Sequence, residues 1–186
     1  MACSPVKTVV TNQYKLDAFS EKRLSNTLTR QSILITQPEA VAGYQTNEMV
    51  YVKKLFELNN FAHSAWVSPP ADMLYPLIVQ SVQRSGFFYA VASSTHSEQT
   101  DYRLDTQLIK LQQNFLTRPS TIDFVVKAVL TNSQDNRVVA SRMINQHIRC
   151  PLENPYGGVL AANIATRQFT AELSSFIVDH VKRDKH

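Results

Sequence analysis

The alternation of apolar and polar residues is clearest in the second half of the chain, where it predicts three long strands. Between Ile122 and Leu130 every second residue is apolar, which is typical of a strand with one buried face. The stretch TNSQDNR that follows is typical of a hairpin turn, and apolar residues from Val138 to Ile148 predict the return strand. An earlier alternation begins at Tyr102 and changes phase near Leu108, which indicates a β-bulge. The three segments predict an antiparallel meander.

Two segments have the apolar spacing of a helix. The first lies between Ser68, which is expected to cap its start, and Gly86, which is expected to end it, with two prolines in the first turn. Pro76 falls inside this segment and predicts a kink or an irregular turn. The second helix is expected from about Tyr156 to His180, because apolar residues recur at helical intervals from Leu160 to Ile177. Each helix is expected to bury one apolar face.

Short strands are expected on either side of the first helix. They are predicted from Asn12 to Asp17, from Gln31 to Thr36, around EMVYV and LFELNN, and at FFYAV. The polar stretch from Phe19 to Arg30 predicts a loop or a weakly ordered segment. Strands, helix, strands and helix in this order are typical of an α+β fold. We therefore expect a two-layer sandwich in which both helices cover one face of a mostly antiparallel sheet.

Length and composition favour a single globular domain. The chain has 186 residues, of which 44% are apolar and 18% charged, as is typical of a packed protein. The net charge of +4 comes from scattered lysines and arginines, without the basic stripe and interleaved aromatic residues of a nucleic-acid groove. No apolar run approaches the roughly 20 residues of a membrane-spanning helix, and no secretory signal is visible. The sequence predicts neither a nucleic-acid partner nor a membrane span.

Motifs that would indicate catalysis or metal binding are missing from the sequence. There is no G-x-S-x-G elbow, no H-E-x-x-H pair and no phosphate-binding loop. The histidines are spread singly, and the two cysteines do not have the spacing of a zinc site. Cys150 is a candidate nucleophile, but on a strand His147 would point away from it because their offset is odd. We therefore expect no enzyme, no catalytic residue, no metal and no cofactor.

Two further pairs are candidates for binding sites, and each has a simpler explanation. Asp101 and Asp105 would lie on one strand face about 13 Å apart, too far for a glycosidase pair, and Arg103 is expected on the opposite side. Solvated carboxylates are the favoured interpretation. Gly157 and Gly158 precede the second helix at the position of an anion cradle, although two glycines there more often ease the turn.

Phe61 and Trp66, in the stretch NNFAHSAWVSPP, are the candidate partner-binding residues. If they are exposed, their rings form a docking or lipid-facing patch. If they are buried, they are core contacts at the start of the following helix. The second interpretation is favoured because aromatic residues are usually buried.

Four segments follow one another in a recognisable order. They are WVSPPADMLYPLIVQSVQRSGFFYAV, TDYRLDTQLIKLQQNF, the hairpin with RVVASR, and a long terminal amphipathic helix. In this order the chain resembles the ABC-type transport auxiliary lipoprotein family, which includes the lipoprotein of the paraquat-inducible intermembrane transport system. The resemblance covers about Tyr44 to Val181 and the first strand around Tyr14 to Asp17. The asparagine-rich stretch before Trp66 departs from the family pattern.

The resemblance gives Cys3 a role. It implies an exported lipoprotein whose signal peptide ends in a lipobox, followed by a cysteine that is acylated and becomes the mature amino terminus. Ala2 and Cys3 match the end of this motif, and Met1 would stand in place of the lost signal. Ser4 is not the aspartate that commonly retains lipoproteins at the inner membrane, so the resemblance implies the outer membrane. Residues 1–11 would form a lipidated linker and residues 12–186 a single auxiliary domain; without the family, Cys3 is an ordinary amino-terminal cysteine.

The resemblance implies a periplasmic docking or conduit component of an intermembrane lipid transport system. Its partners would be an ABC permease, the ATPase of that permease, and a substrate-binding protein with a mammalian-cell-entry (MCE) domain. The protein itself would be a homo-oligomer. The alternative is a periplasmic small-ligand binding module without a transporter partner, for which an apolar cavity with convergent polar groups would be evidence. An enzyme that uses Cys150 is a third hypothesis.

Overall fold

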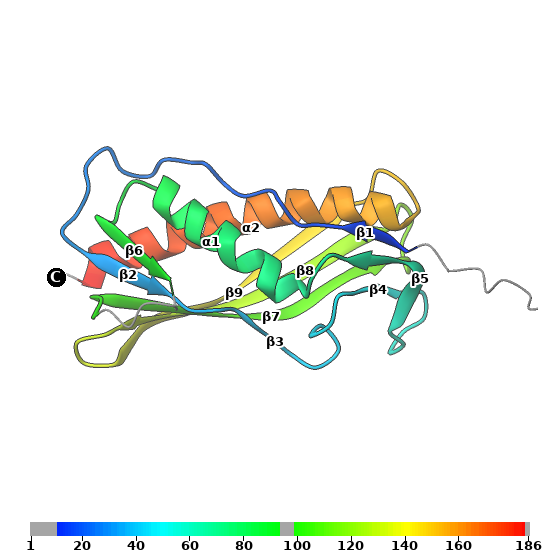
Figure 1. The fold of residues 1–186 in the computed structure, drawn as a ribbon, viewed down its shortest axis with the longest axis horizontal. Helices are drawn as coiled ribbons and strands as arrows, with labels where there is room; N and C mark the ends of the chain where they lie inside the picture. Colours follow the sequence, from blue (N-terminus) through cyan, green and yellow to red (C-terminus); the bar gives the residue numbers. More distant parts are fainter. Residues whose placement is uncertain (1–10, 94–98, 185–186) are drawn as a thin grey trace, which may run out of the picture.

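The computed structural model describes residues 11–93 and 99–184 and shows an elongated molecule (Figure 1). Within these ranges nine strands form one sheet, and two helices lie against it. In chain order the elements are β1 (Asn12–Tyr14), β2 (Ser32–Ile35), β3 (Glu39–Ala40), β4 (Glu48–Val52), β5 (Asn59–Trp66), α1 (Pro70–Arg84), β6 (Ala90–Ser93), β7 (Tyr102–Asn114), β8 (Thr121–Asn132), β9 (Arg137–Arg149) and α2 (Pro155–Asp184). The α+β class expected from the sequence is confirmed.

The three long strands β7, β8 and β9 form the predicted antiparallel meander. β7 and β8 pair from Tyr102 opposite Asn132 to Asn114 opposite Thr121. Their register shifts between Leu108 and Lys110, which confirms the bulge indicated by the change of phase. A turn at residues 133–136 leads from β8 into β9.

The sheet is mixed, because parallel strands pair with the edge of β7 that faces away from β8. The short strands β2, β3 and β4 lie along this edge one after another, and all three run parallel to β7. β6 pairs in parallel with β2, and β1 pairs in parallel with β5. Antiparallel pairing holds in the meander and in the β4–β5 hairpin. The expectation of a mostly antiparallel sheet is therefore correct for the long strands and wrong for most of the short ones.

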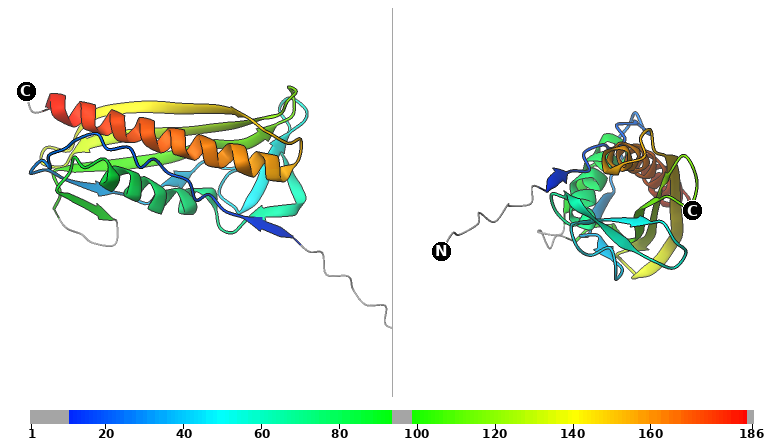
Figure 2. Two further views of the ribbon diagram at one scale, coloured as in Figure 1. Left: turned by 90° about the horizontal axis from the view of Figure 1, so that it is seen from above. Right: turned by 90° about the vertical axis from the view of Figure 1, so that its right-hand side faces the viewer.

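Both helices lie on the same side of the sheet and contact each other, as expected (Figure 1). α2 packs over β8 and β9, and the ring of Phe169 meets the ring of Phe124 edge-on with their centres 5.3 Å apart. Where α1 passes beside α2, the Oγ atoms of Ser81 and Ser174 are 3.1 Å apart. Seen from one end, the sheet curves around the helices, so the two layers are not flat (Figure 2).

The ends of α1 differ in part from the prediction. The residue before the helix is Pro69, and no side chain caps the first turn, so Ser68 is not the cap. Pro70 is the first helical residue, where the missing N–H of a proline costs no helical hydrogen bond. The helix continues through Pro76 to Arg84, and Gly86 follows with a φ of 68° at the expected end.

The polar stretch of residues 19–30 contains no helix or strand, as predicted, but it is held firmly. The backbone N–H of Ser20 donates to Thr170 Oγ1 of α2 at 2.9 Å. The N–H of Leu24 donates to the carbonyl of Ser85 at 2.8 Å, just after α1. This segment is therefore a strap across the helices from β1 to β2, and it is not weakly ordered (Figure 1).

Candidate docking site at the hairpin end

One end of the molecule carries most of the large apolar side chains that the described residues expose. We call it the hairpin end. It comprises the turn of residues 53–58 between β4 and β5, the loop of residues 115–120, and residues 152–164 with the first turns of α2 (Figure 1). Its exposed apolar residues are Leu55, Phe56, Leu58, Leu116, Leu152, Tyr156, Leu160 and Ile164. These residues come from three separate segments that share one end of the molecule, which makes this end a candidate interaction site.

The turn of residues 53–58 presents apolar side chains to solvent. Phe56 is fully exposed at 104%, and Leu55 and Leu58 are exposed at 64% and 51%. Phe56 also has a φ of 67°, in the left-handed region, which costs a bulky L-residue about 1–2 kcal/mol. Phe56 therefore has a strained backbone, and burial of its side chain contributes nothing to stability.

The strand predicted around LFELNN is wrong for most of its length. Residues 55–58 belong to the turn, and β5 begins at Asn59. The turn is closed by the N–H of Glu57, which donates to the carbonyl of Lys54 at 3.2 Å.

A cluster of aromatic rings supports the turn. The ring centre of Tyr51 lies 4.5 Å from that of Phe61 and 6.0 Å from that of Phe115. Lys53 Nζ lies over two of these rings, 5.1 Å from the centre of Tyr51 and 5.5 Å from the centre of Phe115. The N–H of Phe115 donates to the carbonyl of Val52 at 2.8 Å, which ties the end of β7 to the start of the turn. The turn therefore stands on a packed base.

An open hollow of about 720 Å³ lies beside this base. It is lined by Lys53, Phe115, Arg118, Pro119 and Glu153. The Glu153 carboxylate accepts the backbone N–H of Ser120 at 2.7 Å, so it is already engaged. Lys53 and Arg118 give the hollow a positive character.

β1 connects the start of the described chain to the hairpin end. Asn12 lies opposite Ser64 and Tyr14 opposite Trp66 in a parallel pair, and β5 runs away from the turn. The chain therefore enters β1 from the side of the hairpin end. Cys3 lies outside the described residues, and its lipidation stays a prediction.

The structure separates the two candidate partner-binding residues. Trp66 is 3% exposed and belongs to the core at the end of β5, which is the favoured interpretation. Its ring is not accessible to a partner. Phe61 is partly buried in the aromatic base, so of the two it alone lies in the candidate docking site, and its contact with a partner stays a prediction.

Cys150 and His147 do not form a catalytic pair. Cys150 is buried, and burial raises the pKa of its thiol above the ordinary value, which makes it a poor nucleophile. The exposed His147 places Nδ1 2.7 Å from Asp123 Oδ1, across from it on β8. Cys150 follows the last residue of β9 and is buried, whereas His147 lies in the strand and is exposed, so the two side chains do not share one environment.

Asp101 and Asp105 have separate structural partners. Asp101 Oδ2 accepts from the N–H and the hydroxyl of Ser32, at 2.8 and 2.9 Å. Asp105 accepts from the hydroxyl of Thr36 at 2.9 Å and pairs with Arg103 at 2.9 Å. Arg103 thus lies on the same face as Asp105, because an offset of two keeps side chains on one side, and the expectation of the opposite side was wrong. The two carboxylates hold the chain around β2 against β7.

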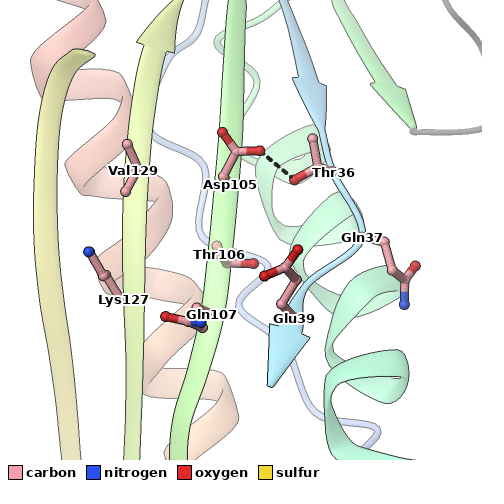
Figure 3. Close-up of a pocket in the computed structure, with 8 residues that line it drawn as sticks. All are labelled: Thr36, Gln37, Glu39, Asp105, Thr106, Gln107, Lys127 and Val129. Atoms are coloured by element: carbon pink, nitrogen blue, oxygen red, sulfur yellow. Dashed lines mark hydrogen bonds between the residues drawn. The ribbon is translucent and has the colours of Figure 1, made fainter. Parts of the chain in front are cut away.

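The hollows do not support the small-ligand alternative. The groove around Asp105 is open, has a volume of about 330 Å³, and lies on the face of the sheet away from the helices (Figure 3). Figure 3 shows its floor of polar side chains from β7 and β8, including Gln107 and Lys127. A hollow in the core beside Trp66 and Gln113 measures about 10 Å³, room for one water at most. Neither is an enclosed apolar pocket of ligand size.

Gly157 and Gly158 are explained by close packing. A Cβ atom at Gly157 would collide with the backbone of Leu152, and one at Gly158 would lie 2.5 Å from Gln113 Oε1. The N–H of Gly157 donates to Asn154 Oδ1 at 2.9 Å, so a side chain already caps the start of α2. Both glycines are helical residues of α2, which begins at Pro155, so they do not precede the helix as expected, and close packing explains them better than a turn or an anion cradle.

No group of three or more His, Cys, Asp or Glu side chains is placed to hold a metal ion within residues 11–93 and 99–184. In the same part of the chain, neither helix has the length and hydropathy needed to cross a bilayer.

Comparison with known proteins identifies the fold. No protein-family model and no curated protein matches the chain. Among solved structures, protein XCC0632 from Xanthomonas campestris, described under the family model DUF330, is 21% identical, with a TM-score of 0.85 over 94% of this chain and 99% of that one. The two proteins share a fold. An uncharacterized protein, 12% identical, has a TM-score of 0.68 over 92% of this chain and 99% of its own. The hypothetical protein CT253 from Chlamydia trachomatis, 7% identical, has a TM-score of 0.51 over 80% and 98%.

Sequence reasoning missed two parts of the hairpin end. Leu55 and Phe56 suggested a strand because they are apolar and no glycine or proline marks the turn. The preceding pair Lys53 and Lys54 was the available signal. On α2, Tyr156, Leu160 and Ile164 recur every four residues on an exposed face, whereas the buried face runs through alanines to Phe169. The apolar residues of this helix thus form two stripes, and only one lies in the core.

Proposed function

We propose that this protein is a bacterial periplasmic lipoprotein, anchored to the outer membrane through acylated Cys3. It acts there as a docking or conduit component of an ABC/MCE-type intermembrane lipid transport system. The observation that carries the proposal is the hairpin end, where exposed apolar side chains gather at the side from which the chain enters β1. Residues 4–11 span at most about 25–30 Å when extended, so an anchor at Cys3 keeps this end close to the membrane. Stable anchoring takes more than one acyl chain.

The role in transport is supported by the segments that resemble the auxiliary lipoprotein family. The partners are then the MCE-domain substrate-binding protein and the ABC permease with its ATPase. ATP is hydrolysed by that ATPase, which agrees with a sequence that has no phosphate-binding loop. The hairpin end and the aromatic base around Phe61 are the surface that meets the membrane or a partner.

A homo-oligomer is supported by the free edge of β9. Within the described residues this 13-residue strand pairs only with β8, so its other edge has N–H and C=O groups available to another strand. β9 carries Arg137, Arg142 and Arg149 and no carboxylate. Arg137 and Arg142 pair with Asp184 and Glu172 of α2, so the charges of β9 do not by themselves prevent a second copy from pairing with its free edge. Light scattering of the purified protein tests this, and a monomer at all accessible concentrations would exclude it.

The anchor is tested by expressing the natural gene with its own leader and feeding a clickable fatty acid. We expect label in the mature protein and in Cys150→Ser, and none in Cys3→Ala, which should also leave the outer-membrane fraction. Affinity purification after cross-linking is expected to recover the MCE-domain protein. An unlabelled wild-type chain would remove the lipoprotein proposal. Label without any transporter component would leave an anchored protein and remove the transport role.

A further inference from the structure

The turn of residues 53–58 has a shape suited to a bilayer surface. Its three apolar side chains, Leu55, Phe56 and Leu58, project from the tip of a hairpin, and Phe56 is exposed on every side. A stable protein interface needs about 800 Å² on each partner, much more than a tip of three side chains supplies. Insertion into the interfacial layer of a membrane needs only a small apolar surface with polar groups around it.

The cations around the tip match anionic headgroups. Lys53 and Lys54 precede the apolar residues, and Arg118 lines the same open hollow as Lys53. Two carboxylates, Glu57 and Glu153, lie among these three cations, so the group keeps an excess of one positive charge. Glu57 lies 3.8 Å from Lys54 Nζ and accepts from Asn59 at 3.0 Å. What faces outward is an apolar tip flanked by positive charge, which attracts an anionic lipid surface.

The aromatic base keeps the tip extended. Tyr51, Phe61 and Phe115 pack beneath it, and Lys53 is held over their rings. Phe56 has a left-handed backbone, and its side chain stands fully exposed above this base. Because the tip is organised before contact, binding costs little conformational entropy.

We propose that Leu55, Phe56 and Leu58 insert into the interfacial layer of a bilayer that contains anionic phospholipid, with Lys53, Lys54 and Arg118 at the headgroups. The contact is a second attachment, chemically independent of the acyl chains on Cys3. This inference names the bilayer as the ligand of the hairpin end. It rests on the proposed function only for the choice of a bacterial membrane.

The test uses the full chain carrying Cys3→Ser, so that no acyl chain contributes. Binding is measured by co-sedimentation with vesicles of phosphatidylethanolamine and phosphatidylglycerol, and with vesicles of phosphatidylcholine alone. We expect binding to the anionic vesicles that weakens with salt. Phe56→Ser should weaken it by about tenfold or more, as expected for losing one inserted aromatic side chain. Lys53→Gln with Lys54→Gln should reduce it and flatten the salt dependence.

Two matched controls come from the opposite end of the molecule. Leu28 and Tyr89 are exposed at 66% and 61%, comparable to Leu55, and Leu28→Ser and Tyr89→Ser should leave vesicle binding unchanged. Thermal unfolding should show that Phe56→Ser is folded, because the side chain touches no core.

The outcomes separate this inference from the lipoprotein proposal. Absent binding of the Cys3→Ser chain to anionic vesicles, or equal binding by Phe56→Ser, overturns the inference even if the fatty-acid label is found. Loss of a cross-linked protein partner in Phe56→Ser, with vesicle binding intact, also overturns it in favour of protein docking. Vesicle binding that depends on Phe56 supports it even where Cys3 carries no label.

Discussion

The two ends of the molecule differ in which side chains are buried and which are exposed. At the carboxyl end, where α2 finishes beside the start of β7, the carboxylate of Asp184 is 5% exposed and well partnered. It accepts from Arg137 at 2.7 Å, from the Tyr102 hydroxyl at 3.0 Å and from Asn132 at 3.1 Å. At the hairpin end, apolar side chains stand in solvent on a strained turn. The carboxyl end uses its polar side chains to stabilise the fold. The hairpin end exposes apolar side chains, as is typical of a surface that binds a partner.

The comparison is tested most strongly by Asp184→Asn. Losing the charge weakens three hydrogen bonds, of which two are partly buried and one is exposed, so we expect the free energy of unfolding to fall by about 2 kcal/mol. Urea denaturation measures this. Asp179→Asn, an exposed position on the same helix, is the control and should change little. Equal effects of the two variants would show that the carboxyl end is not closed by this carboxylate.

The same end should make stability depend on pH on both sides of neutrality. Hydrogen bonding to Arg137 lowers the pKa of Asp184 below its ordinary value of 3.8, so its contribution is present above that value and is lost as pH falls through the lower folded-state pKa. Burial, with the hydrogen bond to Asp184, raises the pKa of Tyr102 to about 12, so its contribution is complete below pH 10 and is lost toward pH 12. Unfolding measured across pH should show both limbs in the wild type. Asp184→Asn should flatten the acid limb, and an unchanged acid limb would contradict the assignment.

Gly157→Ala tests how tightly the hairpin end is built beneath its exposed surface. The new Cβ collides with the backbone of Leu152, which cannot rotate away, so we expect a loss of about 1–3 kcal/mol. Gly158→Ala should cost less, because its obstacle is the end of the Gln113 side chain. Differential scanning calorimetry of both variants gives the order. A larger loss for Gly158→Ala would reverse the argument.

Phe56→Asn should have the smallest effect on stability, and of the opposite sign. Asparagine tolerates the left-handed backbone better than phenylalanine, so relief of strain should raise the free energy of unfolding by about 0.5–1 kcal/mol. Leu55→Asn, outside the left-handed region, is the matched control and should change stability little. A destabilised Phe56→Asn would mean that the ring contributes to the fold, and the contrast between the two ends would weaken.

The parts of the fold that the sequence predicted are those set by local pattern. The phase change at Leu108 placed a bulge, because side chains on a strand alternate strictly between two faces. The pairing of β2, β3 and β4 along one edge of β7 was not predictable in this way. β3 consists of Glu39 and Ala40 alone, too short to carry a period, and its partner lies more than 60 residues away in the chain.

In the candidate site, the burial of individual aromatic residues could not be predicted from the sequence either. Phe56 and Trp66 stand ten residues apart in one stretch, and both are large aromatic residues. The hairpin register places Trp66 over the core at the end of β5 and leaves Phe56 at the turn. Burial depends on this register and on what packs beneath it. The usual burial of aromatic residues therefore predicted the position of Trp66 but gave no sign that Phe56 is exposed.

The parallel pairing of β1 with β5 has a mechanical consequence. A load that pulls the segment before Asn12 outward from the molecule runs along the axis of β1. It acts across the hydrogen bonds between β1 and β5 and on the bond that the N–H of Val67 donates to the carbonyl of Tyr14 at 2.8 Å. The bonds are then sheared together and are not peeled apart one after another. Behind them, the N–H of Ser20 and its bond to Thr170 share the load with α2. A domain pulled by its amino terminus in this geometry therefore withstands a larger force than one attached through the end of a hairpin, where the hydrogen bonds would break one after another.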